Sequence, residues 1–203
     1  MGKVDTYYEY EDDGIYCYPG SFVLKNKLGI EDYEELKAAE REITALKLAQ
    51  MDAEPSLVKQ SFDAKHLCSI HKLAFGDIYE WAGEYRSVNI SKGTLFCAFQ
   101  YISDMVDDLM GKLAAEKFLA DAGGDLGNRL AFYLGEINAI HPFREGNGRT
   151  QRAFVRQLAW RNGHLLSFAD VADEEMAVAS LESFNGNNSK MEEIVARGLS
   201  RLP

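Results

Sequence analysis

The sequence predicts an all-α domain that carries one small β-hairpin. Two observations lead to this prediction. Apolar residues recur at helical spacing through most of the chain, whereas residues 86–99 contain two short β-compatible runs around a turn. The 203 residues, 46% of them hydrophobic and 27% charged, suffice for one sizeable core. We therefore expect a single globular domain behind a short extension at residues 1–20, which is acidic and rich in tyrosine.

The helices are expected in the following order. The first covers residues 31–51, where Leu36, Ile43, Leu46 and Met51 lie near helical spacing. The second runs from about Asp63 and stops near Gly76. Further helical patterns follow over residues 101–119, 127–140, 149–163, 173–184 and 188–200.

The expected hairpin lies between the second and third helices. Its runs are "RSVNI" and "LFCAF", and "SKGT" between them is a plausible connection. No other segment carries a good strand pattern.

Charge and cysteine content exclude several classes of function. The net charge of −10 disfavours a broad nucleic-acid or anionic membrane footprint, but it leaves room for a local anion site. Cys17, Cys68 and Cys97 are odd in number and lack metal-site spacing, so we expect neither a disulfide framework nor a structural zinc. The chain shows no secretory signal and no membrane-spanning run, and we expect a cytoplasmic protein.

The segment "HPFREGNGRTQR", residues 141–152, has the composition of a phosphate site. Pro142 disfavours helical geometry at His141, so the preceding helix should end there. Gly146 and Gly148 permit positive φ angles, which let successive N–H groups point into one concavity. A helix beginning near Arg149 adds its unpaired N–H groups and the positive end of its dipole.

Charged side chains of this segment refine the prediction. Arg149 and Arg152 are expected in the first turn of that helix, where cations are unfavourable unless an anion is bound. Glu145 would repel a phosphate, and a divalent cation between them resolves the conflict, as Mg²⁺ takes carboxylate and phosphate oxygens together. His141 is suited to accept a proton from a nucleophile. The reaction class predicted is phosphoryl or nucleotidyl transfer.

Other interpretations of these residues are weaker. A histidine at a helix end is usually a cap, glycines usually make turns, and an arginine run is usually a solvated face, but all of them at fixed spacing are harder to explain in this way. The chain has no G-x-x-x-x-G-K-(S/T) loop, no strand-linked G-x-G-x-x-G and no H-E-x-x-H, which disfavours the usual nucleotide-binding folds and metalloproteases.

The segment resembles the signature of the Fic family, H-x-F-x-(D/E)-G-N-G-R-x-x-R, at every fixed position. "IYEWAGEYRSVNISKGTLF" and "GEINAIHPF" are similar to the family's flap and to the helix before its active-site loop. "YCYPGSFVLKNKLGI" resembles the start of Fic proteins in the bacterial toxin and secreted-effector groups. The resemblance covers about residues 15–200, and we assign the Fic domain to residues 21–203.

This resemblance implies a Fic-type helical bundle that transfers AMP from ATP to a protein Ser, Thr or Tyr hydroxyl. His141 would be the general base, and Glu145 would hold Mg²⁺ on the α- and β-phosphates. The other residues implied in binding ATP are Phe143, which would anchor the loop in the core, Arg144, the anion hole of Gly146, Asn147 and Gly148, Arg149 at the β-phosphate and Arg152 at the γ-phosphate.

Two further features follow from the resemblance. A related branch that phosphorylates its target has lysine at the position of Gly148, so glycine favours AMP transfer. The hairpin at residues 87–99 would be the flap that aligns an extended target segment, with Lys92 and Gly93 at its tip near the nucleotide. A surface hairpin without a binding role is the alternative.

Many Fic proteins carry an inhibitory helix with (S/T)-x-x-x-E-(G/N). Here Ser189 to Glu193 has the acid at the right spacing, but Ile194 replaces the required residue, which we interpret as coincidence. The implied protein is then the toxin of a toxin–antitoxin pair, inhibited by a small antitoxin that carries the motif. Type II topoisomerase subunits are the first targets to test, and host GTPases are the alternative if the chain is part of a delivered effector. A catalytically silent nucleotide-binding module, or transfer of another phosphate-containing group, stays open.

Overall fold

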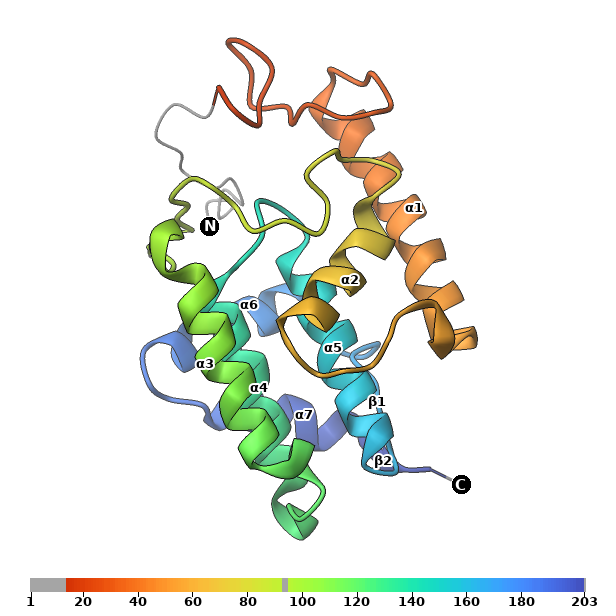
Figure 1. Ribbon diagram of the computed structural model, residues 1–203, viewed down its shortest axis with the longest axis vertical. Coiled ribbons are helices and arrows are strands. Elements are labelled where there is room, and N and C mark those ends of the chain that lie inside the picture. The colour runs from red at the N-terminus through yellow and green to blue at the C-terminus, as the bar shows by residue number, and fades with distance from the viewer. Residues whose placement is uncertain (1–13, 93–94, 203) are drawn as a thin grey trace.

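The computed structural model describes residues 14–92 and 95–202, which form a helical bundle with one two-stranded sheet (Figure 1). The predicted fold class is confirmed. The α-helices are α1 (Tyr33–Ala53), α2 (Ala64–Phe75), α3 (Ile102–Ala115), α4 (Leu126–Ile140), α5 (Asn147–Arg161), α6 (Asp173–Phe184) and α7 (Ser189–Gly198), and the strands are β1 (His164–Leu166) and β2 (Leu199–Arg201).

Helix ends follow the capping residues in the sequence. The Asp32 side chain accepts the N–H of Glu35 at the start of α1, and Asp63 accepts that of His66 at the start of α2, both at 2.9 Å. Helix α2 ends at Phe75 with Gly76 as its C-cap, where the sequence predicted the stop. Helix α5 begins at Asn147, two residues before the predicted start, so Arg149 lies in its first turn and Arg152 in its second.

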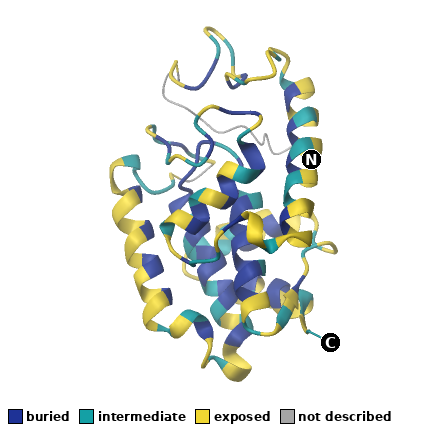
Figure 2. Ribbon diagram, turned by 45° about the vertical axis from the view of Figure 1, so that its right-hand side comes forward, coloured by how far each residue is buried: buried dark blue, intermediate teal, exposed yellow. Residues whose placement is uncertain are grey.

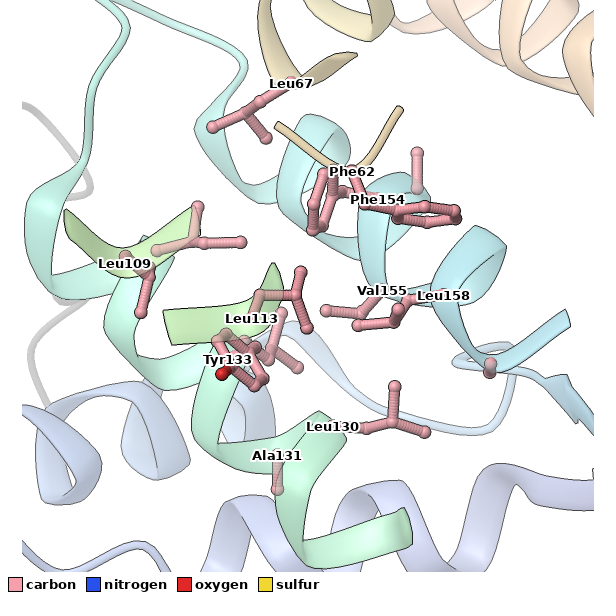
Figure 3. Close-up of a cluster of buried hydrophobic side chains, with 14 of the residues drawn as sticks. Phe62, Leu67, Leu109, Leu113, Leu130, Ala131, Tyr133, Phe154, Val155 and Leu158 are labelled. Carbon is pink, nitrogen blue, oxygen red and sulfur yellow. The ribbon is translucent and has the colours of Figure 1, made fainter. Parts of the chain in front are cut away.

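Helices α4 and α5 lie at the centre of the bundle. Helix α4 packs against α3, α6 and α7, while α5 packs against α2 and β1 (Figure 1). Buried residues gather on the inward faces of these helices, whereas the outer face of α3 is exposed (Figure 2). Figure 3 shows part of this core, with side chains from α3, α4, α5 and the segment before α2: Leu109, Leu113, Leu130, Tyr133, Phe154, Val155, Leu158 and Phe62.

A second apolar cluster holds the N-terminal segment against α1 and the end of α2. Val23 and Leu24 are buried there beside Leu36 of α1. Tyr16 and Cys17, which the sequence assigned to the extension before residue 21, are buried in the same cluster. This segment therefore forms one wall beside the start of α5.

The sheet lies at a different place from the predicted one. Strands β1 and β2 are antiparallel, with His164 opposite Arg201. In the predicted hairpin, the described residues contain no strand and only one antiparallel bridge, between Ser91 and Leu95. Instead, the arms of this segment bond largely to side chains, such as Asn89, which accepts the N–H of Phe99 at 3.1 Å. We keep the name flap for residues 87–99.

Two other observations bear on the sequence predictions. None of Cys17, Cys68 and Cys97, all of which the structure describes, forms a disulfide. Within the described part of the chain, no helix has both the length and the apolar character needed to cross a bilayer.

Candidate active site

The site is built on the turn that joins α4 to α5. Helix α4 ends at His141, which adopts the left-handed conformation with φ 51° and donates its N–H to the Ile137 carbonyl at 3.0 Å. This conformation is uncommon for a residue other than glycine. It sends the chain sharply away from α4, as Pro142 led us to expect.

The side chain of Asn147 closes the turn into a ring. Its Oδ1 accepts the N–H of Phe143 at 2.8 Å, and its Nδ2 donates to the Phe143 carbonyl at 2.7 Å. The Phe143 side chain is 1% exposed, so it anchors the loop in the core as expected and does not face a ligand. Both residues thus shape the loop.

His71 of α2 supports the same turn, a role that the sequence did not indicate. Its ring stacks on Phe143 with centroids 4.0 Å apart. Nδ1 accepts the N–H of Gly83 at 2.8 Å, so the proton is on Nε2, which donates to the Glu145 carbonyl at 3.0 Å. Burial lowers the pKa of His71 to about 4, which keeps this tautomer neutral.

Gly146 is the glycine that the turn requires. It has φ +79°, and a Cβ there would lie 2.2 Å from the Phe75 ring. We expected positive φ at Gly148 as well, which is wrong, because Gly148 is a helical residue of α5. The Gly146 N–H already binds an anionic group in this structure: it donates to Glu145 Oε1 at 2.8 Å. Burial and the charge of Glu40 raise the pKa of Glu145.

Arg149 is held by α1. Its guanidinium donates to the Glu40 carboxylate and, at 3.0 Å, to Thr44 Oγ1. Glu40 also accepts the Tyr79 hydroxyl at 2.5 Å. Glu145 lies 3.6 Å from the same guanidinium. Glu40 and Thr44 are additions to the predicted site, and the signal for them was two polar residues one turn apart at buried positions of the first helix.

Arg149, Arg152 and Arg144 line a cavity of about 770 Å³ between α1, the N-terminal segment and the start of α5. Burial and the charge of Arg149 lower the pKa of Arg152, which indicates crowded positive charge. Among the described residues, the lining contains five cationic side chains and two carboxylates, an excess of three positive charges: Lys37, Arg41, Arg144, Arg149 and Arg152 against Glu40 and Glu145. Such a cavity in a chain of net charge −10 favours an anion.

Arg144 is less accessible than the sequence suggested. It is 1% exposed, lies over the Tyr16 ring at 5.7 Å and approaches Cys17 Sγ at 3.6 Å. Its contact with a nucleotide stays a prediction.

His141 is not among the described residues that line this cavity, although Arg144 and Glu145 of the same turn are. Its Nδ1 is 3.1 Å from the Asn138 carbonyl, so the proton is on Nδ1 and the lone pair is on Nε2. Phe96 of the flap stacks on the ring with centroids 3.8 Å apart. Burial, together with the charges of Arg86 and Lys92, lowers the pKa of His141 to about 3. The imidazole is therefore neutral at pH 7.

Of the two residues predicted at the flap tip, the structure describes one. Lys92 is exposed, and its charge acts on His141. Gly93 lies outside the described residues.

Comparison with known proteins identifies the family. The Fic/DOC family model matches residues 61–159, which include the turn described above. A Salmonella typhimurium protein named probable protein adenylyltransferase Fic is 39% identical over 91% of this chain and 92% of its own length. The chain belongs to the Fic/DOC family.

Other Fic proteins support the same assignment. The protein adenylyltransferase VbhT of Bartonella schoenbuchensis is 36% identical over 92% of this chain, which spans only 39% of that protein. The relatives confirm the predicted enzyme class, protein adenylyltransferase.

Solved structures of Fic proteins also match. The Bartonella tribocorum effector BepC with bound AMPPNP is 25% identical, with a TM-score of 0.84 over 93% of this chain and 98% of that one. A Bartonella quintana Fic domain with bound ADP is 27% identical, with a TM-score of 0.84 over 93% of this chain and 96% of that one. These nucleotide-bound structures support nucleotide binding by this fold.

Proposed function

We propose that this protein transfers AMP from ATP to a Ser, Thr or Tyr hydroxyl of a target protein. The observation that carries the proposal is the cavity at the start of α5, whose described residues carry three excess positive charges, together with a neutral imidazole on the same turn. A binding module needs the positive charge but not the histidine. The curated relatives named protein adenylyltransferases support the same reaction.

His141 would act as the general base. Its Nε2 takes the proton of the target hydroxyl while the hydroxyl oxygen forms a bond to the α-phosphorus of ATP and the bond from that phosphorus to the β-phosphate oxygen breaks. Pyrophosphate leaves, and the target carries AMP. Because opposite charge raises the pKa of an imidazole, the anionic nucleotide would make His141 a stronger base than it is in the free protein.

The phosphates would bind where α5 begins. The N–H groups of the first turn of α5 have no partner within the helix, and they add to the Gly146 N–H, which already holds a carboxylate in this structure. Arg149 keeps donors beyond those that it gives to Glu40 and Thr44, since a guanidinium has five N–H groups. We assign Arg149 to the β-phosphate and Arg152 to the γ-phosphate.

Glu145 fits a magnesium ion that arrives with the nucleotide. Within the described residues no group of three or more His, Cys, Asp and Glu side chains forms a complete metal site. A single carboxylate suits Mg²⁺, which commonly takes one or two carboxylates together with phosphate oxygens and water. The raised pKa of Glu145 also indicates a carboxylate whose charge is poorly compensated. When bound, the ion would neutralise charge on the phosphates.

The flap would align the target beside His141, through pairing of an extended target segment with the flap backbone. Phe96 covers one face of the imidazole, and exposed Leu95 lies next to it in the chain.

An inhibitor acting in trans is also proposed. The cavity beside Arg152 has room for a side chain of another protein. The near-match to the inhibitory motif does not occupy it: Glu193 is exposed on α7, and no ion pair joins it to Arg152 in the part of the chain described here. We expect toxicity on expression that co-expression of a small protein with the inhibitory motif relieves. Harmless expression of an active enzyme would contradict this arrangement.

The transfer reaction is tested with labelled ATP. The purified protein is incubated with cell lysate, Mg²⁺ and ATP labelled at the α-phosphate or, in parallel, at the γ-phosphate. We expect α-label on a protein band with the wild type and with the control His164→Ala, and none with His141→Ala. Label from the γ-phosphate alone would indicate a kinase, and nucleotide binding without any label would indicate a silent module. A band that takes label only from another nucleotide would indicate a different donor.

A further inference from the structure

The flap and the turn that carries His141 are joined by one buried side chain, Arg86. This residue is 2% exposed and lies just before the flap. Its Nε donates to the His141 carbonyl at 2.9 Å, and its Nη1 donates to the Val88 carbonyl at 2.7 Å. Its Nη2 donates to the carbonyl of Cys97 and, at 3.3 Å, to that of Ile140.

These carbonyls belong to three separate backbone segments. Val88 lies on the first arm of the flap, Cys97 on the second arm, and Ile140 and His141 at the end of α4. One planar group, with donors in a fixed fork, therefore sets the spacing of all three. The backbone adds two weaker ties, from Arg86 N–H to the Pro142 carbonyl at 2.9 Å and from Cys97 N–H to the Ala139 carbonyl at 3.4 Å.

The contact with His141 also stabilises an unfavourable backbone conformation at the end of α4. His141 holds a left-handed conformation that disfavours any side chain, at a helix end whose last carbonyls have no partner in the helix. A buried cation that donates to these carbonyls satisfies them and complements the negative end of the α4 dipole. The conformation that aims the imidazole thus depends on the residue that holds the flap.

We propose that Arg86 is a positioning residue, which keeps the flap and the His141 imidazole in one fixed arrangement. This inference rests on the proposed function. In that reaction, a target segment aligned by the flap must place its hydroxyl at His141, which requires a fixed distance between the flap and the imidazole. We expect no direct contribution of Arg86 to ATP binding, since the acceptors named above lie on the flap and at the end of α4 and are not among the described residues of the cavity lining.

The first test compares Arg86→Lys with the wild type and with Arg129→Lys, a control arginine that pairs with Glu116 on the surface of the bundle. Lysine keeps the charge but cannot reach the three segments at once. At saturating ATP we expect Arg86→Lys to label the target band about 10- to 100-fold more slowly. The ATP concentration for half-maximal rate should stay within about twofold of the wild-type value, and Arg129→Lys should match the wild type in both. A rate equal to that of the wild type, or an equally large change in half-saturating ATP, would overturn the proposal.

The second test needs no activity and no variant. Hydrogen exchange of the wild-type protein is followed in increasing denaturant. The amides of Arg86 and Cys97, which bond to the α4 end, should exchange through one common opening, with the same free energy and denaturant dependence. Separate openings would show that the flap and the turn are independent. If exchange reports one unit but no labelled band appears with wild type, the proposed function fails while the coupling by Arg86 stands.

Discussion

Replacing Gly146 with alanine tests how the turn is built. Alanine at φ +79° costs about 1–2 kcal/mol, because the left-handed region crowds Cβ against the backbone. The new Cβ would also lie 2.2 Å from the Phe75 ring, and such overpacking costs a further ~1–3 kcal/mol. We expect Gly146→Ala to lower the free energy of unfolding by about 2–5 kcal/mol.

Gly163 supplies a matched control for this substitution. Its φ is +77°, nearly that of Gly146, but a Cβ there would meet no atom within 4 Å. Gly163→Ala should therefore lower the free energy of unfolding only by the cost of alanine at a positive φ, about 1–2 kcal/mol. Urea unfolding followed by circular dichroism measures both variants. Equal losses in the two would refute the claim that Phe75 closes the space beside the turn.

Three more predictions concern the binding residues, the ring closed by Asn147 and the buried histidines. Arg149→Ala should weaken the binding of AMPPNP and of ADP alike. Arg152→Ala should lower the affinity for AMPPNP about 10- to 100-fold and the affinity for ADP little, because only AMPPNP has a γ-phosphate and one charge-assisted contact contributes about 1.5–3 kcal/mol. Calorimetric titration of both nucleotides checks this, and an equal loss for ADP in Arg152→Ala would contradict the γ-phosphate assignment. Asn147→Ala removes two hydrogen bonds and leaves the Phe143 backbone groups unpaired, so it should cost about 2–4 kcal/mol by urea unfolding, while the exposed Asn185→Ala should change little. The pKa values of His71 and His141 are about 4 and about 3 in the folded chain, below the ordinary 6.5, so the unfolded chain binds more protons below pH 6.5 and the free energy of unfolding decreases as the pH is lowered. Lowering the pH from 7 to 5 should therefore reduce the free energy of unfolding by about 4 kcal/mol through these two histidines. NMR ring resonances of both histidines that titrate near pH 6.5 in the folded protein would contradict this prediction.

The helices and the turn were largely predictable because their determinants are local. Asp63 and Gly76 cap α2 within a few residues of the positions that they control. Pro142 follows the residue at which α4 ends. The difference at Gly148 has a simple cause: a glycine permits a positive φ but does not require one, and here the helix begins early enough to include it.

The contacts that complete the site join residues far apart in sequence, and no local pattern predicts them. Glu40 precedes Arg149 by 109 residues, and the pair forms only because α1 packs beside the start of α5. Arg86 is separated from His141 by 55 residues. The sequence did not predict the pairing of β1 with β2 for the same reason. Each strand has only three residues, and helices α6 and α7 separate the two strands in sequence.

The central claim is that a triphosphate binds at the turn between α4 and α5 with its α-phosphorus facing His141. A crystal structure of the protein with AMPPNP and Mg²⁺ tests it most directly. We expect the phosphates at the first turn of α5, in contact with Arg149 and Arg152, and the α-phosphorus on the Nε2 side of the imidazole. A nucleotide bound elsewhere, or one whose α-phosphorus points away from that nitrogen, would contradict it.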